Sequence, residues 1–449
     1  MIDPMTQCAD PTTPANKPPV TQLTGDQVNR YRRHLLLPEV GMDGQKKLLN
    51  AKVLCIGAGG LGCPISLYLA AAGVGTIGLA DVDVVSPSNL QRQILFGVSN
   101  VGEDKVKVAA RRLKDLNPDV NVIEHKVVVN SSNVLDLLKD YDIIIDGTDN
   151  FPTRYCVNDA CVMLKKPNVY GSIFRFEGMV TVFAPHLLNP LRQTDNAGER
   201  GPCYRCMYPD PPDPGSVPSC AEGGVVGVLP GIIGTLQANE VIKLILGVGT
   251  PAIGKLTVFA SLDFDFRTFK LRRDKNCPVC GDNPTITKPI DYEQFCGVPI
   301  LDPKSQEETA NEVKQAKSGG AKAQSDPSLD ARGLPPGYPF KPDWEVTPRE
   351  VKSLLDRGAK FVFIDCRLPN EHQITHIEGA TLLPLQQLPQ RFNEIASHAN
   401  EKVIVHCRSG QRSLSFAQAL RQQGFKDVKS MAGGILLWNK DVNPGGPQY

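Results

Sequence analysis

Short apolar runs that end in glycines or carboxylates set the pattern of the first half of the chain. The run Val53–Ile56 has the length of a buried strand and leads into closely spaced glycines, and residues 65–72 then predict a helix that ends at Gly73. A second buried strand is expected over Tyr141–Ile145, and it ends in Asp146-Gly-Thr-Asp-Asn150. Strands that alternate with helices predict an open α/β sheet, in which ligands bind beyond the carboxyl ends of the strands.

The patterning continues on both sides of these strands. Residues 22–49 predict helical structure, residues 225–248 a mostly apolar helix packed against the sheet or a partner subunit, and residues 256–271 two closing strands. We therefore expect an α/β protein whose first domain is Rossmann-like and contains a mixed sheet.

A change of composition separates this region from a second one. Between Asn283 and Asp343 the residues Lys, Gln, Ala, Ser, Gly and Pro dominate, which predicts a flexible linker. Beyond it strands and helices alternate again, which predicts a second, smaller α/β domain. The expected division is a disordered N-terminal tail over 1–21, a first domain over 22–285, the linker over 286–342 and a second domain over 343–445.

Composition and charge narrow the classes of function. The formal net charge of the 449 residues is +1, which gives no sign of general nucleic-acid or membrane-surface binding. No apolar run is expected to span a bilayer, and the N-terminus lacks a secretory pattern, so we expect a cytoplasmic protein. Thirteen cysteines in such a chain indicate metal or thiol chemistry rather than a disulfide framework.

The glycine turn after the first strand has the spacing of a nucleotide-binding loop. Gly57, Gly59, Gly60 and Gly62 let the backbone approach a phosphate, and the helix that follows offers unpaired N–H groups at its N-terminus. Asp81, after the next strand-like run, is placed to bind a ribose hydroxyl. The alternative is a tight turn without a ligand, but a strand, a helix and Asp81 together favour binding.

Charged residues after the strands bear on which nucleotide is bound. A nicotinamide cofactor needs the glycines and Asp81 but few cations, whereas a triphosphate needs cations for its charge and a carboxylate for Mg²⁺. Arg92 and Lys105 supply the cations, and Asp149 supplies the carboxylate with Asn150 beside it. Each of these residues alone could be an ordinary surface charge. Their joint placement favours ATP over NAD.

Two C-x-x-C pairs, Cys203-Tyr-Arg-Cys206 and Cys277-Pro-Val-Cys280, have the ligand pattern of a structural zinc site with four thiolates. The separation of the pairs exceeds that of a zinc ribbon, so the site would tie two distant loops together. Four buried free cysteines are the alternative.

Two further cysteines lie in loops that suit thiol chemistry. Cys220 follows Pro218 and precedes Gly223 and Gly224, a context for either an exposed nucleophile or a chance surface cysteine. Cys407 follows the strand-like run 402–405 and precedes a helix. A glycine-containing loop at a helix N-terminus, together with Arg408 and Arg412, favours its thiolate. Asp365 and Arg367, at the end of a neighbouring strand, are expected to brace that loop.

These motifs carry two family resemblances. Residues from about 22 to 285 resemble the molybdopterin-synthase adenylyltransferase branch (ThiF/MoeB) of the ubiquitin-activating-enzyme-like superfamily, through Gly57–Gly62, Asp81–Asp83, Ser88–Gln93, Asp146–Asn150 and both cysteine pairs. Residues from about 343 to 445 resemble a rhodanese domain through Asp365–Arg367, His376–Ala380 and the Cys407 loop. The order of the domains matches proteins that activate ubiquitin-like sulfur carriers and then sulfurate them.

The first resemblance implies roles for the matching residues. ATP would be bound by the glycine turn and by Asp81, Ser88, Asn89, Leu90, Gln91, Arg92 and Lys105. Asp149 would hold Mg²⁺ beside Asn150, and Cys203, Cys206, Cys277 and Cys280 would hold Zn²⁺. Arg33, in an R-Y-x-R pattern, would be an arginine finger that reaches the ATP of the neighbouring subunit, which implies a homodimer.

The resemblances also assign the reactive thiols. Cys407 matches the persulfide carrier, and Cys220 matches a cysteine linked to acyl transfer, either as the acceptor of the acyl group or as the thiol that reduces an acyl disulfide. Cys366 departs from the rhodanese pattern, which more often has an aliphatic residue there. We interpret Cys366 as a packing residue, with a second thiol able to resolve Cys407 as a disulfide as the alternative.

The implied reaction is ATP-dependent adenylation of the C-terminal glycine of a ubiquitin-like sulfur carrier. The carrier would be of the molybdopterin-synthase small-subunit type and end in Gly-Gly. Sulfur from the Cys407 persulfide, loaded by a donor such as a cysteine desulfurase, then gives a thiocarboxylate. A carboxylate with a pKa of about 3.5 is already ionised, so adenylation needs no general base. Three alternatives stay open: the same chemistry on a thiamine- or cysteine-pathway carrier, an NAD-dependent oxidoreductase fused to a sulfurtransferase, and a non-catalytic scaffold.

Overall fold

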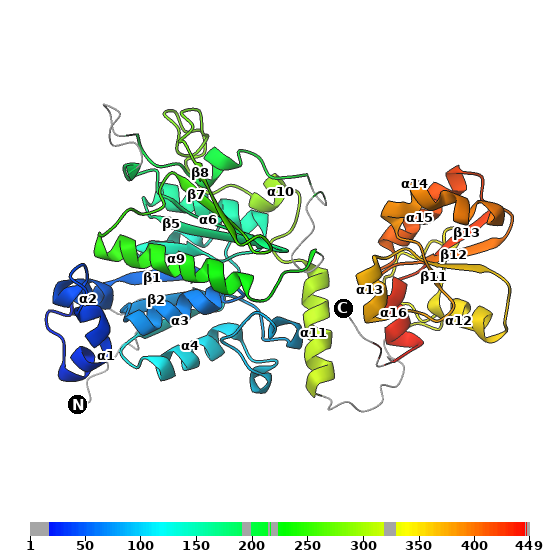
Figure 1. The fold of residues 1–449 in the computed structure, drawn as a ribbon, viewed down its shortest axis with the longest axis horizontal. Coiled ribbons are helices and arrows are strands. Elements are labelled where there is room, and N and C mark those ends of the chain that lie inside the picture. The colour runs from blue at the N-terminus through cyan, green and yellow to red at the C-terminus, as the bar shows by residue number, and fades with distance from the viewer. Residues whose placement is uncertain are drawn as a thin grey trace, which may run out of the picture. The chain divides into compact units, whose positions relative to one another are not determined.

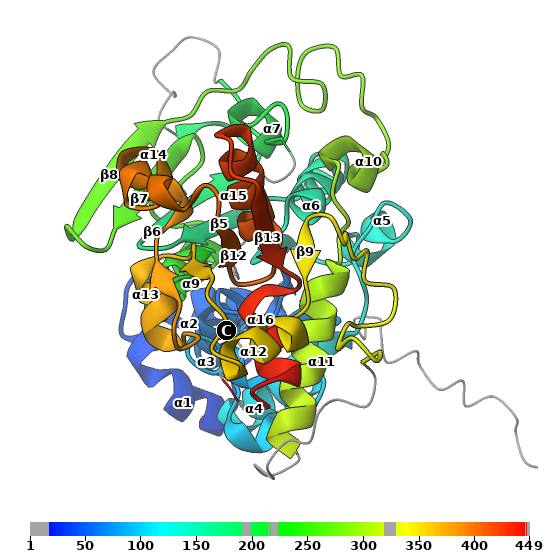
Figure 2. The same cartoon turned by 90° about the vertical axis from the view of Figure 1, so that its right-hand side faces the viewer.

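The chain forms two compact units, residues 1–317 and 318–449, each with its own sheet. The computed structural model, shown in Figures 1 and 2, describes residues 18–190, 199–213, 216, 223–317, 329–444 and 446. Most of the tail predicted to be disordered, the predicted nucleophile Cys220 and residues 318–328 of the predicted linker lie outside the described residues.

The first unit is built on an eight-stranded mixed sheet with the order β3-β2-β1-β4-β5-β6-β7-β8. The five strands from β3 to β5 in this order are parallel, and β5 to β8 continue as antiparallel neighbours. The strands are β1 Lys52–Ile56, β2 Thr76–Ala80, β3 Asn121–His125, β4 Ile143–Asp146, β5 Asn168–Phe174, β6 Glu177–Phe183, β7 Lys255–Ala260 and β8 Asp265–Lys270. The expected Rossmann-like unit with a mixed sheet is confirmed.

Helices cover both faces of this sheet because alternate strand residues point to opposite sides. Val53 and Cys55 of β1 belong to the core under α3, α4 and α9, whereas Leu54 and Ile56 belong to the core under α5 and α6. The helices are α1 Gly25–Leu35, α2 Gly41–Asn50, α3 Gly62–Ala72, α4 Lys105–Leu116, α5 Val134–Leu138, α6 Phe151–Met163, α7 Tyr204–Met207 and α9 Leu229–Leu246.

Helix α9 corrects one expectation from the sequence. Among the described residues it is the one helix whose length and apolar composition would suffice to cross a membrane, although no such run was expected. Half of this 18-residue stretch is buried, and the helix packs on α3, β5 and β6. Core helices of water-soluble domains have the same composition, because a helix that is apolar on most sides is a buried one.

Part of the predicted linker folds with the first unit. Helix α10, Tyr292–Cys296, begins at Asp291, whose carboxylate caps the Gln294 N–H at 3.0 Å. Helix α11, Pro303–Lys317, has proline at its start, where the missing N–H costs no hydrogen bond, and lies beside the sheet at the right of the first unit in Figure 1. The composition did not indicate these helices, because α10 is a single short helix that buries Tyr292 and Cys296 in the core, whereas α11 is mostly polar.

The second unit contains five parallel strands in the order β11-β10-β12-β13-β9, with helices on both faces. The strands are β9 Glu345–Val346, β10 Val362–Asp365, β11 Thr381–Leu382, β12 Lys402–His406 and β13 Asp427–Met431. The helices are α12 Pro348–Asp356, α13 Pro369–Ile374, α14 Leu388–Arg391, α15 Gln411–Gln422 and α16 Gly434–Asp441. This confirms the smaller α/β fold expected from the alternating pattern.

Candidate active site and zinc centre

The glycine turn joins β1 to α3 at the carboxyl edge of the parallel strands. Gly57 has a φ of +91°, and a Cβ at this position would lie 2.9 Å from the Gly147 carbonyl oxygen beyond β4. A Cβ on Gly62 would lie 2.0 Å from the Gly57 oxygen. These two glycines are therefore required by the backbone packing of the turn itself.

Gly59 and Gly60 have more open surroundings. The nearest atoms to an added Cβ belong to side chains, Gln93 at 3.6 Å from Gly59 and Pro230 at 3.2 Å from Gly60. Leu61, which precedes α3, provides no side-chain cap for the first turn of the helix. Uncapped N–H groups at a helix start bind anions well, so this half of the turn has the geometry of a phosphate site.

Asp81 braces the glycine turn from the end of β2. Its Oδ2 accepts a hydrogen bond from the Ala58 N–H and its Oδ1 one from the Asp83 N–H, both at 2.8 Å. Burial raises the pKa of the Asp81 carboxyl, and the nearby Lys105 charge opposes this shift. Each carboxylate oxygen keeps a second lone pair, so binding a ribose hydroxyl is compatible with the bracing role.

Lys105, the first residue of α4, points its ammonium group into a ring of carboxylates. The side chain is buried, and its Nζ lies 3.0 Å from Asp83 Oδ2. Burial alone would lower the pKa of Lys105, but Asp81, Asp83 and Asp149 together raise it. The structure therefore brings residues from β2, α4 and β4 to one charged site, as the sequence predicted for Lys105, Asp81 and Asp149.

The segment after β4 lies against the glycine turn. The Gly147 N–H donates to the Ile56 carbonyl at 2.9 Å, which joins the ends of β1 and β4. Asp149 is exposed there, whereas Asn150 accepts the Thr153 N–H at 2.9 Å and so caps α6. Asp149 is thus accessible to solvent, and Asn150 has a structural role as a helix cap that the sequence did not reveal.

Arg154 and Asp146 are polar residues of this site that the sequence analysis did not single out as ligands. Arg154 donates to the Thr148 carbonyl at 3.0 Å. Burial raises the pKa of the Asp146 carboxyl, and the positive charge of Arg154 opposes this shift only in part. Arg154 Nε and Asp146 Oδ2 are buried without a hydrogen-bond partner in the described part of the chain. Unpaired buried polar atoms at strand ends indicate room for a polar ligand. The signal in the sequence was an arginine one helical turn after the Asn150 cap.

The segment Ser88–Arg92 follows β2 and carries five predicted nucleotide ligands. Ser88 and Asn89 lie in a 3₁₀ turn, Leu90 is half-buried against the core, and Gln91 is exposed. Arg92 donates to the Ser88 carbonyl at 3.1 Å, which folds the guanidinium back over the turn. The segment is close to the glycine turn, since Arg92 Cδ would lie 3.7 Å from a Cβ on Gly60.

Helix α11 contacts this segment directly. Glu312 Oε2 accepts hydrogen bonds from the Ser88 hydroxyl at 2.7 Å and from the Ser88 N–H at 3.3 Å. Gln306 donates to Asp83 Oδ1 at 3.2 Å. A nucleotide that binds through Ser88 would therefore replace the Glu312 contact.

Arg33 lies at the opposite end of the parallel strands from the glycine turn. It is exposed on α1, two residues after Tyr31, whose ring packs on Gly73 in the turn that enters β2. The Tyr31 hydroxyl also accepts from Asn117, in the turn that precedes β3. These turns lead into the amino ends of β2 and β3, so Arg33 is far from the nucleotide site of its own chain.

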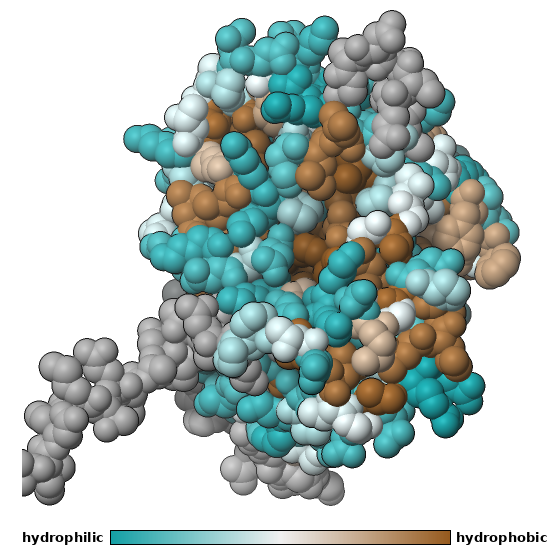
Figure 3. Space-filling model, turned by 90° about the vertical axis from the view of Figure 1, so that its left-hand side faces the viewer, coloured by the Kyte–Doolittle hydropathy of each residue, from teal (hydrophilic) through white to brown (hydrophobic). Residues whose placement is uncertain are grey.

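An apolar surface surrounds this end of the first unit. Figure 3 shows apolar side chains gathered on the face that carries α1 and α2 at the left of Figure 1. Exposed side chains of this kind come from the turn after α1, from α2 and from α3: Leu36, Leu37, Met42 and Tyr68. Exposed apolar groups in such numbers on adjoining helices mark a surface for association.

The four predicted zinc ligands meet in space. The Sγ atoms of Cys203, Cys206, Cys277 and Cys280 all lie within 4.8 Å of one another. Cys206 and Cys280 lie 3.4 Å apart, Cys203 and Cys277 3.6 Å, and Cys203 and Cys206 3.9 Å. Zn–S bonds of about 2.3 Å place tetrahedral thiolates about 3.8 Å apart, so the cluster fits a closed Zn²⁺ site. A buried ion pair, Arg205 with Asp159 at 2.9 Å, fixes the loop that bears the first pair.

We expect metal analysis of the purified protein to find about one zinc per chain, because four thiolates complete one tetrahedral site. Cys280→Ser should lose the metal and lower the melting temperature. Cys296→Ser is the matched control, since Cys296 is a buried cysteine outside the cluster. Full zinc content in the Cys280→Ser protein would contradict the assignment.

Cys407 occupies a cradle of donors at the end of β12 in the second unit. Its Sγ accepts from the Gly410 N–H at 3.1 Å and from the Ser413 hydroxyl at 3.4 Å. Gly410 adopts a φ of +95°, which turns its N–H toward the sulfur. A hydrogen bond from Cys366 is the strongest influence on Cys407, and with Ser413 and Arg412 it lowers the thiol pKa to about 5 against the effect of burial.

Asp365 and Arg367, the predicted brace of this loop, bind each other at the end of β10, and Arg367 also donates to the Thr375 carbonyl at 2.8 Å. Asp365 and Arg367 form a fully buried ion pair at 2.6 Å, and Arg367 and His406 lower the pKa of Asp365 to about 2 although burial alone would raise it. Burial lowers the pKa of His406 to about 4. His406 is therefore neutral near pH 7, and the positive charge beside Cys407 comes from Arg412, which is paired with Glu371 at 2.6 Å.

The rate of Cys407 alkylation by iodoacetamide should rise through about pH 5 and level off before neutral pH, because only the thiolate reacts. Cys366→Val should move the midpoint upward, since it removes the strongest lowering contact. Peptide mass spectrometry of the Cys407 peptide gives the profile. A midpoint near the ordinary thiol value of about 8.5 would contradict the cradle.

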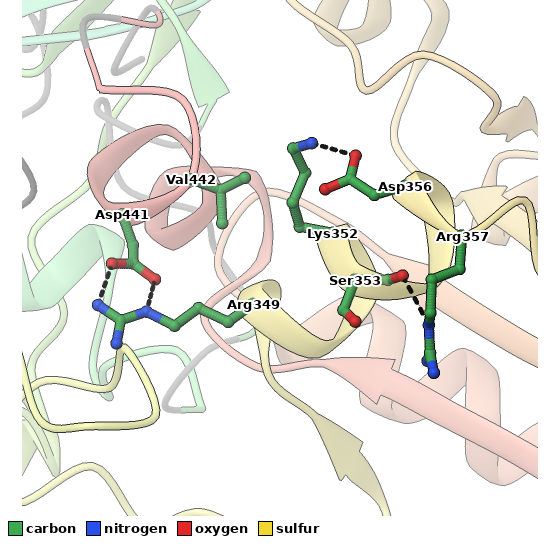
Figure 4. A pocket seen from close by; sticks show the side chains of 7 residues that line it. All are labelled: Arg349, Lys352, Ser353, Asp356, Arg357, Asp441 and Val442. Atoms are coloured by element: carbon green, nitrogen blue, oxygen red, sulfur yellow. Dashed lines mark hydrogen bonds and ion pairs between the residues drawn. The ribbon is translucent and has the colours of Figure 1, made fainter.

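A hollow of about 500 Å³ on the second unit has no part in this chemistry. Figure 4 shows its lining by α12 and the end of α16. Four of its charged side chains are already paired, Arg349 with Asp441 at 2.6 Å and Lys352 with Asp356, and Arg357 donates to the Ser353 carbonyl. Asp441 ends α16, whereas Ile435 at the other end donates its N–H to the Cys407 carbonyl, so the hollow is about one helix length from the thiol.

The two units thus define a nucleotide-binding α/β enzyme linked to a domain with an activated thiol. Family comparison matches residues 31–279 to the ThiF family and residues 347–441 to the rhodanese-like domain. The chain belongs to the ThiF family and carries a C-terminal rhodanese-like domain.

Two of the relatives described next align with nearly the whole chain, and the third aligns with about three fifths of it. The chain is 41% identical over 431 residues to the probable adenylyltransferase/sulfurtransferase MoeZ of Mycobacterium tuberculosis, which covers 96% of this chain and 97% of that protein. It is 37% identical over 442 residues to adenylyltransferase and sulfurtransferase MOCS3 of Culex quinquefasciatus, covering 96% and 91%. The sulfur carrier protein adenylyltransferase of Thermus thermophilus is 50% identical over 275 residues, which is 61% of this chain and 98% of that protein.

The protein is therefore an adenylyltransferase and sulfurtransferase. An adenylyltransferase of this family uses ATP, which agrees with the sequence-based preference for ATP over a nicotinamide cofactor.

Proposed function

We propose that the protein adenylates the C-terminal glycine of a ubiquitin-like sulfur carrier and converts it into a thiocarboxylate. The carrier is of the molybdopterin-synthase small-subunit type and ends in Gly-Gly. The observation that carries the proposal is the activated Cys407 thiol on the same chain as the nucleotide site. Two of the relatives, MoeZ and MOCS3, are named for both activities, and the Thermus relative is named for a sulfur carrier protein.

Adenylation joins two anions, the carrier carboxylate and the α-phosphate of ATP, so positive charge in fixed positions lowers its barrier. Gly59 and Gly60 would cradle phosphate, Asp81 would hold the ribose, and Lys105 and Arg92 would neutralise phosphate charge. Asp149 would hold Mg²⁺, which would supply further positive charge to the phosphates. The exposure of Asp149 and its proximity to Lys105 support this assignment.

Sulfur transfer uses the other unit. Cys407, loaded as a persulfide by a donor such as a cysteine desulfurase, attacks the carbonyl of the acyl-adenylate and AMP leaves. The Gly410 N–H and the Ser413 hydroxyl stabilise the sulfur anion. The reaction requires the Cys407 loop to meet the adenylate during the cycle, which the chain between the units would permit. Cys220 of the first unit is predicted either to accept the acyl group or to reduce an acyl disulfide. We place these reactions in the cytoplasm.

We also propose that the active form is a homodimer in which Arg33 completes the partner subunit's nucleotide site. Two observations support it: Arg33 lies at the far end of the strands from its own glycine turn, and an apolar surface flanks it. Pairing this surface between two copies would bury the apolar groups and move each Arg33 toward the other chain.

The dimer model predicts complementation between two inactive variants. Arg33→Ala and Asp149→Asn should each lose carrier adenylation. When the two variants are co-expressed and form heterodimers, part of the adenylation activity should return. In each heterodimer, one of the two sites has an intact Asp149 and receives an intact Arg33 from the other chain. The readout is ATP–pyrophosphate exchange. No recovery despite proven heterodimers would show that Arg33 acts within its own chain.

The experiment for the function itself measures ATP–pyrophosphate exchange with and without a ubiquitin-fold carrier that ends in Gly-Gly. Exchange should depend on the carrier and vanish when its terminal glycine is removed. A scaffold without catalysis would give no exchange. Carriers of molybdenum-cofactor, thiamine and cysteine pathways, compared in parallel, identify the preferred one by their rates.

A further inference from the structure

The second unit contains two cysteines, Cys366 and Cys407, and the fold places them side by side. They are the residues that directly follow the paired strands β10 and β12, whose last register pair is Asp365 with His406. The Cys366 N–H continues the ladder by donating to the His406 carbonyl at 2.9 Å. Neighbouring strands lie about 4.8 Å apart, inside the Cα separation of about 4.4 to 6.8 Å that a disulfide requires.

The two side chains point into the same core. Residues paired across a ladder face the same side of a sheet, and both thiols are fully buried in one apolar cluster. The Cys366 thiol donates a hydrogen bond to the Cys407 sulfur. A second thiol in contact with the reacting sulfur is more than a packing residue, because a methyl group would fill that space without a polar contact.

We propose that Cys366 is the thiol that releases the product from Cys407. This inference rests on the proposed function, in which persulfide attack leaves the carrier joined to Cys407 as an acyl disulfide. The Cys366 sulfur attacks Cys407 Sγ, the bond from Cys407 Sγ to the outer sulfur breaks, and the carrier thiocarboxylate leaves with the electron pair. The Cys366 proton passes to solvent. The Cys366 sulfur is oxidised and the outer sulfur is reduced, while the Cys407 sulfur passes from one disulfide to another.

The next cycle needs a reductant, which we assign to the class of small dithiols or dithiol proteins. It returns both cysteines to thiols by ordinary exchange. A thiocarboxylate is a weak base and leaves readily, which favours attack by Cys366 over return of the carrier. While Cys407 is in the acyl disulfide it has no negative charge, so the main obstacle to ionising the neighbouring Cys366 is removed.

The first test needs no carrier. The full chain, reduced and then freed of reductant, is treated with 2,2′-dithiodipyridine at about pH 6, where Cys407 is a thiolate and ordinary thiols are not. The wild type should release a second thiopyridone for each Cys407 modified and yield a Cys366–Cys407 disulfide, mapped by peptide mass. Cys366→Ser and Cys366→Val should stop at the mixed disulfide. Serine keeps the hydrogen bond to Cys407, so it separates resolution from thiolate stabilisation.

A persistent mixed disulfide in the wild type, or a disulfide that joins Cys407 to another cysteine such as Cys220, would overturn the role of Cys366. So would a second release from the Cys366→Ser protein.

The second test uses a Gly-Gly-ending ubiquitin-fold carrier, ATP and a polysulfide-loaded enzyme without reductant. Wild type should release one round of thiocarboxylate, whereas Cys366→Ser should retain the carrier on Cys407 until dithiothreitol is added. Equal release from both proteins without reductant would refute Cys366 while leaving the proposed function intact. If the wild type gave no thiocarboxylate even with dithiothreitol, the proposed function would be refuted. The dithiodipyridine experiment would still test whether Cys366 forms a disulfide with Cys407.

Discussion

Cys407→Ala should abolish formation of carrier thiocarboxylate and leave carrier-dependent pyrophosphate release unchanged. Loss of a nucleophile removes the route through it, so we expect sulfur transfer to fall on the order of 10⁴-fold or more. Adenylation should persist because its residues lie in the first unit, whose glycine turn, Lys105 and Asp149 are packed independently of Cys407. Both reactions are followed in one assay, pyrophosphate by a coupled enzyme and the carrier by mass.

Cys296→Ala is the control for general thiol loss, because Cys296 is buried in the first unit away from both predicted chemical centres. It should retain both activities. Loss of pyrophosphate release in the Cys407→Ala protein would contradict the division of labour between the two units.

Asp149→Asn should remove adenylation and its dependence on Mg²⁺. The carboxylate is the exposed acid at the β4 end of the site, and it contributes to the field that keeps Lys105 charged. Losing an electrostatic ligand of the transferring group typically costs about 10²- to 10³-fold, so exchange should fall by at least this factor. Since Asp149 is exposed and caps no helix, the melting temperature should stay near that of the wild type.

Asp136→Asn provides the matched control, an exposed carboxylate on α5 that pairs with Lys139 at 2.8 Å. It should exchange pyrophosphate like the wild type. Retained exchange in the Asp149→Asn protein with an unchanged Mg²⁺ response would reject the metal assignment and leave Asp146, with its unpaired buried oxygen, as the acid to test.

The sequence allows functional residues to be placed where they come directly after a parallel strand. Gly57, Asp81 and Asp149 each come within a few residues of a parallel strand, and such ends must meet at one edge of the sheet. The four-cysteine cluster could also be predicted from the sequence. The C-x-x-C spacing brings two ligands together locally, and only the meeting of the two pairs depends on the fold.

Contacts between elements that are far apart in the chain could not be predicted from the sequence. Glu312 binds Ser88 although the two residues are more than two hundred positions apart in the sequence. Helix α11 is so polar that its sequence pattern does not indicate which side faces the core. The contact of Arg154 with the Thr148 carbonyl, just after β4, depends on how α6 packs and is visible only in the structure. The register of β10 against β12 likewise decides that Cys366 touches Cys407, which the sequence left as an alternative to packing. Such contacts depend on tertiary packing that local pattern does not encode.

The most direct test of the central claim measures the intact mass of a Gly-Gly-ending sulfur carrier after incubation with the full chain, ATP, Mg²⁺, a persulfide donor and a dithiol reductant. The carrier should gain the mass that corresponds to one oxygen replaced by one sulfur at the C-terminal carboxyl, and this gain should be absent without ATP and absent with Cys407→Ala. A carrier that leaves the complete mixture with its original mass, while pyrophosphate is released, would contradict it.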